Sequence, residues 1–252
     1  MMKFEAYISE TEVATMQRIS LNRNQIKYIV IIAMLMDHIA MSFFVPTSVI
    51  YQIMRFIGRL TGPTMAYLLA EGYLHTRNVK KYALRLLVFS VISWIPFSLL
   101  NTGKFFSPAF GVIFSLLLGL LGIWIWDKAK IHIAWKVLII ILFCGLSFFG
   151  DWFIFDILWP LFLFIYRDDP KKKWTSFFVI TVIEILVILG LMFSRGAIQE
   201  GMYQVGTLMV PFMMMFLYNG ESGSRHPFHK WFFYVFYPLH LLILALIKIY
   251  VF

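Results

Sequence analysis

Long apolar stretches, separated by short basic connections, constrain this sequence more than any other feature. A helix needs roughly 20 apolar residues to cross a hydrocarbon core about 30 Å thick. Nine stretches of roughly that length fall at 25–45, 52–74, 83–100, 108–126, 132–149, 152–167, 175–194, 203–218 and 231–251. We therefore predict an all-α fold, a polytopic integral membrane bundle of about nine transmembrane helices.

The composition excludes several other classes of protein. Of the 252 residues, 61% are hydrophobic and 14% charged, whereas soluble domains average about 45–50% and about 25%. The single cysteine, Cys144, excludes a disulfide framework and a cysteine-based zinc site, and we expect no metal. The net charge of +9 forms no single basic stripe, so we expect no nucleic-acid partner.

The distribution of Lys and Arg predicts the orientation in the membrane. Alternate connections, beginning with the N-terminus, hold 17 of the 22 basic residues, and the other connections hold three. Cytoplasmic loops carry such an excess. We expect a cytoplasmic N-terminus, an outer C-terminus and a location in the inner (cytoplasmic) membrane of a bacterium. Residues 1–20 then form a polar cytoplasmic tail, and residues 21–252 form one transmembrane domain.

Ionisable residues inside the apolar stretches are candidates for function. A charge near the bilayer centre costs about 2.5–3.5 kcal/mol on insertion scales, so a protein keeps one there when it is paired, hydrated or functional. The candidates are Asp37, His38, Arg55, Arg59, Glu71, Glu184 and His240.

The first two spans bring four of these residues to a similar depth. Asp37 and His38 are neighbours on a helix, point about 100° apart and need separate partners. Arg55 and Arg59 are four residues apart and share one face. Asp37 is either part of an ion pair with an arginine or part of a reactive site. His38 is either a buried hydrogen-bonded imidazole or a general base, since its ordinary pKa lies near 6.5. The run 61–63, Thr-Gly-Pro, predicts a distortion after Arg59.

The last span and the loops carry the remaining candidates. Tyr237 and His240 are three residues apart beside Pro238, so they share a face that is either a core hydrogen-bonding pair or part of a site. Glu71 fits an interfacial ion pair with a nearby base. The cluster Lys171, Lys172 and Lys173 fits orientation or anionic lipid, or else an anchor for a phosphorylated cytosolic donor. Glu184 has no assigned role: it either pairs with Arg59 or His240 or is neutral.

Several motifs together resemble the TraX family, named for the membrane protein that N-acetylates pilin subunits in conjugative transfer. They are Leu21–His38, with its basic start and Met-Asp-His-Ile-like core, Arg55-x-x-Gly58-Arg59, Ala70-Glu71-Gly72-Tyr73-x-His75-Thr76-Arg77-Asn78, Tyr82-x-x-Arg85-Leu86, Ile92-Ser93-x-Ile95-Pro96-Phe97, Asp151-Trp152 and Tyr234-x-x-Tyr237-Pro238-x-His240-Leu241. They follow the family's order over nearly the whole chain. The sequence departs from the pattern after Asp151-Trp152, where Phe153 and Asp156 replace small residues.

The resemblance implies an acyltransferase that uses acetyl-CoA as acyl donor. The family is similar to a larger membrane superfamily that O-acetylates glycans across the membrane. By this resemblance His38 is the catalytic base, and Asp37, His240 and Tyr237 complete the catalytic site. Arg59 and Arg55 bind the donor. We assign Glu71 and the Lys171–Lys173 cluster to the same donor-binding side.

The implied acceptor is an amine or hydroxyl of a pilin, a peptide or a cell-surface molecule, reached from the outer side of the lipid bilayer. The residues do not distinguish N- from O-acetylation. Two other classes remain open. One is a membrane transporter with a buried proton relay, and the other is a non-catalytic assembly factor.

Overall fold

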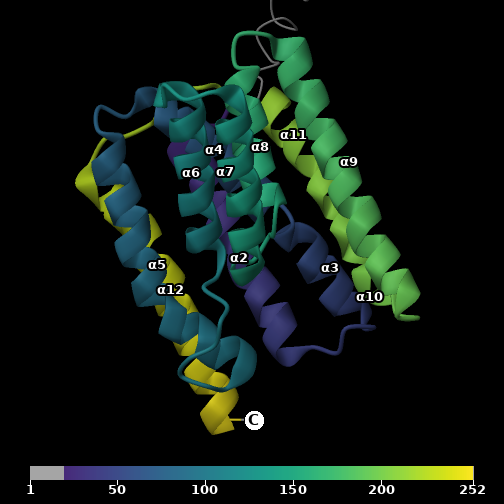
Figure 1. Cartoon of the computed structure of the whole chain (residues 1–252). Helices are drawn as coiled ribbons and strands as arrows, with labels where there is room; N and C mark the ends of the chain where they lie inside the picture. Colours follow the sequence, from purple (N-terminus) through teal and green to yellow (C-terminus); the bar gives the residue numbers. More distant parts are fainter. Residues whose placement is uncertain (1–19, 252) are drawn as a thin grey trace, which may run out of the picture.

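A computed structural model describes residues 20–251, and over that range the chain folds into helices (Figure 1). The helices are α2 (Arg23–Phe43), α3 (Val49–Gly58), α4 (Thr61–His75), α5 (Val79–Thr102), α6 (Val112–Lys128), α7 (Ile133–Leu146), α8 (Phe155–Ile165), α9 (Pro170–Ser194), α10 (Ile198–Gly201), α11 (Met209–Phe216) and α12 (Pro227–Val251), with 3₁₀ segments η1 (Ser147–Phe149) and η2 (Met202–Leu208). The described residues contain no strand, so the all-α prediction is confirmed for them. Apart from Ser20, the expected polar tail lies outside the described residues.

Each predicted apolar stretch falls on one or two of these helical segments. The second stretch covers α3 and α4, and the eighth covers η2 and α11. Four helices in residues 20–251 are long and apolar enough to cross a membrane by themselves: α2, α5, α9 and α12. The protein is therefore a helical membrane protein with four candidate spans. Nine transmembrane helices and the orientation of the termini stay predictions.

A break after Arg59 divides the second stretch into α3 and α4. Helix α3 ends at Gly58, and α4 begins at Thr61. Pro63 lies in the first turn of α4, where a backbone N–H has no partner within the helix, so the missing donor costs nothing there. The distortion expected at Thr61-Gly62-Pro63 is thus the start of a new helix, and Arg59 lies in the short connection between α3 and α4.

Polar caps fix where the long helices begin. The side chain of Asn22 accepts from the backbone of Gln25, whose side chain accepts from the backbone of Asn22, so α2 starts with a capping box. Asn78 caps α5, and Asp169 caps α9 ahead of Pro170. The starts of α5, α9 and α12 lie toward the same end of the bundle, at the top of Figure 1. The basic connections that precede these helices are therefore brought to one end.

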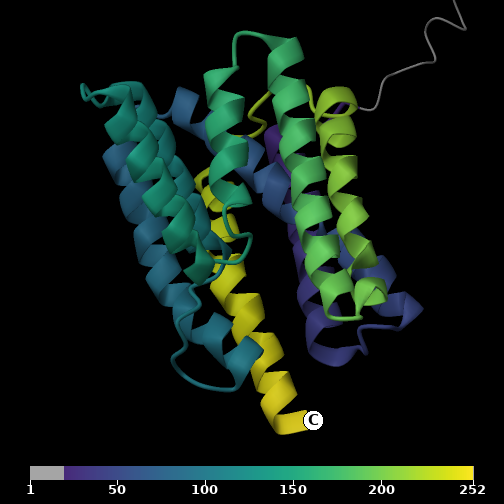
Figure 2. The ribbon, with the colours of Figure 1, turned by 45° about the vertical axis from the view of Figure 1, so that its right-hand side comes forward.

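The bundle has a buried aromatic core and an apolar exterior. Trp159 of α8 and Phe177 of α9 are fully buried. In contrast, outward-facing side chains such as Val91 of α5, Leu142 of α7 and Leu186 of α9 are more than half exposed and apolar. Figure 2 shows α9 and α11 on one side of the bundle, with α5, α6 and α7 on the other. An apolar exterior of this kind suits contact with lipid.

Candidate functional site

Asp37, Arg55 and Arg59 form a buried charge cluster between α2 and the end of α3. Arg55 donates through Nη1 to Oδ2 of Asp37 over 2.6 Å, and Nη2 of Arg59 lies 2.9 Å from both carboxylate oxygens. All three residues are less than 9% exposed. Of the two interpretations of Asp37, the ion pair agrees with these contacts, because both carboxylate oxygens accept hydrogen bonds from arginine.

Aromatic side chains enclose this charge cluster. The guanidinium of Arg55 lies 4.4 Å from the ring centroid of Tyr203 and donates to its hydroxyl over 2.8 Å. The guanidinium of Arg59 lies 4.4 Å from the ring of Trp152. Glycine at position 58 is required for the close approach, because a Cβ there would overlap the Asp37 carboxylate. The cluster is thus a closed, packed element that joins α2, α3, η2 and the loop before α8.

His38 points away from this cluster and contacts α12. Its Nδ1 lies 3.0 Å from Nε2 of His240, and Nδ1 of His240 lies 2.8 Å from the carbonyl oxygen of Phe236. A carbonyl only accepts, so His240 donates through Nδ1, and in its neutral form Nε2 must then accept from His38. This chain of hydrogen bonds leaves the lone pair of His38 on Nε2. The histidine pair, His38 and His240, therefore presents a base with a fixed tautomer.

Tyr237 packs against both histidines. Its ring centroid lies 6.4 Å from that of His38 and 5.6 Å from that of His240. The hydroxyl accepts a hydrogen bond from the backbone N–H of Val112 over 3.3 Å, which leaves its own proton available. Gly111, at φ +80°, permits this approach, since a Cβ there would lie 2.6 Å from the hydroxyl oxygen. Tyr237 is therefore a hydrogen-bond donor held beside the base.

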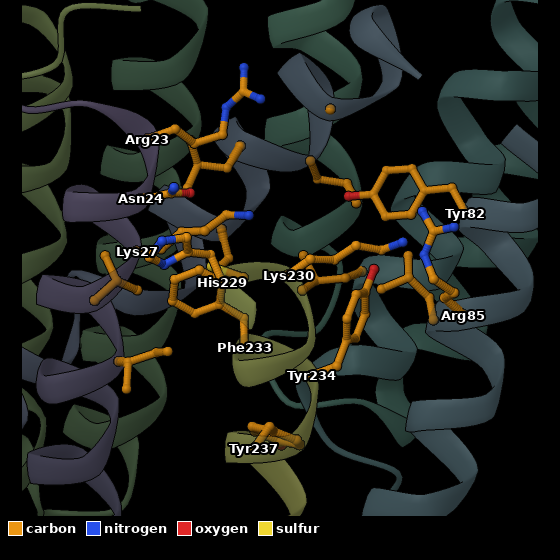
Figure 3. Close-up of a pocket in the computed structure, with 18 of the residues that line it drawn as sticks. Arg23, Asn24, Lys27, Tyr82, Arg85, His229, Lys230, Phe233, Tyr234 and Tyr237 are labelled. Carbon is orange, nitrogen blue, oxygen red and sulfur yellow. The ribbon is translucent and has the colours of Figure 1, made fainter. Parts of the chain in front are cut away.

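A cavity of about 410 Å³ runs from the basic end of the bundle to Tyr237 (Figure 3). Basic and imidazole side chains surround its mouth: Arg23, Lys27, His75, Arg85, Arg225, His226, His229 and Lys230. Figure 3 shows Lys27 and His229 on one wall, Tyr82 and Arg85 on the other, and Tyr237 at the inner end. The inner walls are largely apolar, from residues such as Met34, Leu69 and Ile113.

The inner end of the cavity lies next to the histidine pair. Met34 lines it and is one helical turn before His38, and Tyr237 lines it and touches both histidines. His38 follows Arg23 by 15 residues, a rise of about 22 Å along α2. A ligand that entered between the cations would therefore have to be long and thin to reach the base.

Several residues that the sequence assigned to this site lie elsewhere. Arg55 and Arg59 bind Asp37 and do not line the cavity, and neither do Lys171, Lys172 and Lys173. Asp37 does not contact His38 through a hydrogen bond, because the two side chains leave α2 toward α3 and α12. The resemblance assigns Asp37 and His38 to one catalytic site, but the structure places Asp37 with the two arginines and His38 with His240.

Two other carboxylates have partners that the structure now gives. Glu71 pairs with Arg23 over 3.0 Å and accepts from the hydroxyl of Tyr218, so it braces a residue of the cavity mouth. Glu184 accepts from the side chain of Gln204 rather than from Arg59 or His240. Among residues 20–251, no group of three or more His, Cys, Asp or Glu side chains is arranged to hold a metal ion.

Most residues of the cavity mouth are not among the candidates that the sequence predicts. Four of them, Arg85, Lys230, Tyr82 and Tyr234, come from α5 and α12, whose basic residues by themselves indicate only the orientation in the membrane. The Nε atom of Arg85 is buried and has no hydrogen-bond partner in the described structure. One sequence signal does point to these residues. Each helix places a cation three or four residues from a tyrosine, at Tyr82-x-x-Arg85 in α5 and at Lys230-x-x-x-Tyr234 in α12.

Comparisons with known proteins agree on the family. The model of the TraX protein family matches residues 22–248, which is most of the chain. The chain is also 32% identical over 235 residues to the probable fimbrial assembly protein FimC, serogroup H1, of Dichelobacter nodosus, and the match covers 90% of this chain and 95% of that protein. No solved structure matches it. This chain therefore belongs to the TraX protein family.

Proposed function

We propose that this protein is an integral membrane acetyltransferase that moves an acetyl group from cytosolic acetyl-CoA to an amine or hydroxyl acceptor. One observation carries the proposal: a cavity with a cationic mouth ends at Tyr237, in contact with a histidine pair whose free lone pair is on His38. This arrangement suits a donor with several phosphates at one end and a thioester at the other.

The cavity residues fit the donor by charge and by shape. Arg85, Lys230, Lys27 and Arg225 supply positive charge at the mouth, and the Nε of Arg85 is free to donate. The volume of about 410 Å³ falls within the roughly 300–1,000 Å³ of small-molecule sites. The apolar inner walls suit a narrow arm better than a bulky polar group. The donor assignment thereby moves from the predicted arginine pair to the residues of the cavity.

The chemistry assigns separate roles to His38 and Tyr237. His38 takes the proton of the acceptor through Nε2 as the acceptor N or O attacks the thioester carbonyl. Tyr237 donates its hydroxyl proton as a hydrogen bond to the carbonyl oxygen, where negative charge develops. The C–S bond then breaks, and protonated His38 returns the proton to the thiolate as CoA leaves.

His240 acts through His38 as a positioning residue. It fixes the tautomer of His38 from one side and is itself anchored on the carbonyl of Phe236. Asp37, Arg55 and Arg59 hold α2 against α3 and therefore set where His38 stands. Their part in the reaction is structural, because each guanidinium is already bonded to Asp37.

The location follows from the same orientation argument. A donor from the cytosol requires that the basic end of the bundle faces the cytoplasm, as the Lys and Arg distribution predicts. We place the protein in the cytoplasmic membrane as a multi-pass protein, with the acceptor approaching from the other side. A protein or peptide N-terminus and a cell-surface molecule are both suitable acceptors.

The relative's name favours one alternative, a non-catalytic role in fimbrial assembly. That relative is called a probable fimbrial assembly protein, and it matches nearly the whole chain. An assembly factor would need the fold and its surface, but it would need neither the fixed tautomer of His38 nor a cationic cavity. The same residues therefore separate the two functions.

The experiment is acetyl transfer by purified protein in detergent or nanodiscs. Acetyl-CoA labelled in the acetyl group is supplied with membrane and periplasmic fractions as acceptors, and labelled product and free CoA thiol are measured together. We expect labelled product and thiol in equal amounts. If the folded protein neither binds CoA nor consumes acetyl-CoA, the acetyltransferase proposal fails and the assembly role stands.

A further inference from the structure

Two buried carboxyl groups, Asp156 of α8 and Glu184 of α9, lie on helices that pack against each other, away from the cavity. The helices run antiparallel, and the indole N–H of Trp159 donates to Oγ1 of Thr181 over 3.2 Å. Asp156 lies three residues before Trp159, and Glu184 lies three residues after Thr181. Residues three apart lie about one turn apart on the same face of a helix. Because the helices run in opposite directions, Asp156 and Glu184 therefore lie at the same height along the helix pair, one turn beyond that hydrogen bond.

Neither carboxyl group has the partners that a buried anion needs. Asp156 is fully buried, and both of its oxygens lack a hydrogen-bond partner in the described structure. Glu184 is 2% exposed; its Oε1 accepts from Gln204 and its Oε2 has no partner there. An isolated ionised carboxylate in such surroundings is very costly, and such a group is neutralised instead.

The charged groups around the pair do not supply a free cation. The charged groups that interact electrostatically with Asp156 are both carboxyl groups, Asp151 and Glu184. The cation that interacts with Glu184 is Arg59, whose guanidinium is bonded to Asp37. Helix α6 packs against this turn of α8 with Gly119, which brings no charge. Two carboxyl groups that interact in surroundings of low dielectric constant do not both ionise.

We propose that Asp156 and Glu184 form a proton-binding site inside the membrane domain, which exchanges protons through Asp151. Asp151 is an exposed residue five positions before Asp156. Tyr237, beside the histidine pair, is close enough to Asp151 and Asp156 to interact with both electrostatically. The site thus lies between the outside and the proposed reaction centre. Buried ionisable groups of membrane proteins mark such proton paths.

This role rests on the proposed function, and the proton count gives it a purpose. An amine acceptor arrives as an ammonium ion, so its acetylation yields amide, CoA thiol and one released proton. His38 takes this surplus proton from the ammonium ion and must lose it before it can accept the second proton during attack. In this proposal the proton passes from His38, past Tyr237, to Asp156 and Glu184, and leaves the protein through Asp151.

Infrared spectroscopy of the purified protein tests the site without any acetyl transfer. At neutral pH we expect a carbonyl band of protonated carboxylic acid that shifts within minutes in D₂O. The band falls in Asp156→Asn and in Glu184→Gln, which keep the shape of each side chain, and Asp151→Asn slows the shift. The control Asp168→Asn, at an exposed loop position, leaves it unchanged.

The outcomes separate this proposal from the proposed function. A wild-type spectrum without the band, or a band that neither D156N nor E184Q reduces, overturns the proton site whether or not the protein transfers acetyl groups. A band that never exchanges in D₂O overturns it as well. If the band behaves as expected and no acetyl transfer is found, the site stands and the acetyltransferase fails. If both hold, we expect D156N to slow amine acetylation about tenfold and to change its pH profile.

Discussion

Asp37 and His38 are adjacent in the sequence and belong to different parts of the molecule. The Asp37 carboxylate leaves α2 toward α3 and is bonded to two arginines, within a closed and packed cluster. The His38 imidazole leaves α2 toward α12 and ends next to a cavity. The turn of about 100° between neighbours on a helix thus separates a structural site from a chemical one. Depth in the membrane alone does not show which residues share a pocket.

The largest expected effect is on the chemical side of α2. His38→Ala removes the base and should lower acetyl transfer by about 10²–10⁴-fold, the usual contribution of general base catalysis. We expect the melting temperature and CoA binding to change little. The matched control is His132→Ala, an exposed histidine at the start of α7 that should keep full turnover. Equal loss in both variants, or normal turnover in H38A, would remove His38 from the chemistry.

The opposite result is expected one residue earlier. Asp37→Ala leaves Arg55 and Arg59 buried without their anion, and breaking such a pair costs about 3–5 kcal/mol. Thermal unfolding in detergent should therefore occur at a markedly lower temperature than for H38A. Asp168→Ala, which removes an exposed carboxylate, controls for the loss of charge. A fully stable Asp37 variant with impaired turnover would mean that Asp37 acts in the reaction, contrary to our account.

Substitutions at two glycines test the packing of the Asp37 cluster. Gly58→Ala pushes a methyl group into the Asp37 carboxylate and should cost about 1–3 kcal/mol of stability, as overpacking does. Gly122→Ala places its Cβ 3.8 Å from the nearest side-chain atom, an ordinary contact, and should cost far less. Melting curves of the two variants measured side by side check this. If the two variants melt at the same temperature, the charge cluster accommodates the added methyl group at no cost in stability, which would contradict our account.

The smallest effect is expected at the cavity mouth, where several cations contribute to binding of the donor phosphates, so that the loss of one weakens binding only in part. Arg85→Gln should raise KM for acetyl-CoA about tenfold, or about 1.4 kcal/mol, with kcat unchanged, since the lost contact is made before and during the reaction. Lys171→Gln, which removes a cation outside the cavity, is the control. Steady-state kinetics at fixed ionic strength measure both. A fall in kcat with unchanged KM would place Arg85 at the reacting atoms instead.

Local features of the fold were predictable from the sequence. Apolar stretches predicted where the helices lie, and Thr61-Gly62-Pro63 predicted the break before α4. The capping box of Asn22 and Gln25 at the start of α2 is a local pattern of the same kind. Each rests on spacing within a few residues, which the helix geometry fixes. The shared face of Tyr237 and His240 is confirmed for the same reason.

Contacts between distant helices were not predictable in the same way. His38 and His240 are 202 residues apart, and nothing local states that α2 and α12 lie side by side. The cavity mouth draws on α2, α4, α5, α12 and the loop before α12, so its residues share no pattern in one segment. Pairing of Asp37 with arginine remained one of two interpretations, because depth was known and direction was not.

Equilibrium binding of CoA tests the central claim most directly, namely that the donor enters the cavity between α2, α5 and α12. Binding is measured by calorimetry on wild-type protein, on the mouth variant Arg85→Gln with Lys230→Gln, and on the loop variant Lys171→Gln with Lys172→Gln. Both double variants remove two positive charges. We predict that the mouth variant loses most of the affinity and the loop variant keeps it. Loss of affinity in the loop variant alone would contradict the account and return the donor to the Lys171–Lys173 cluster.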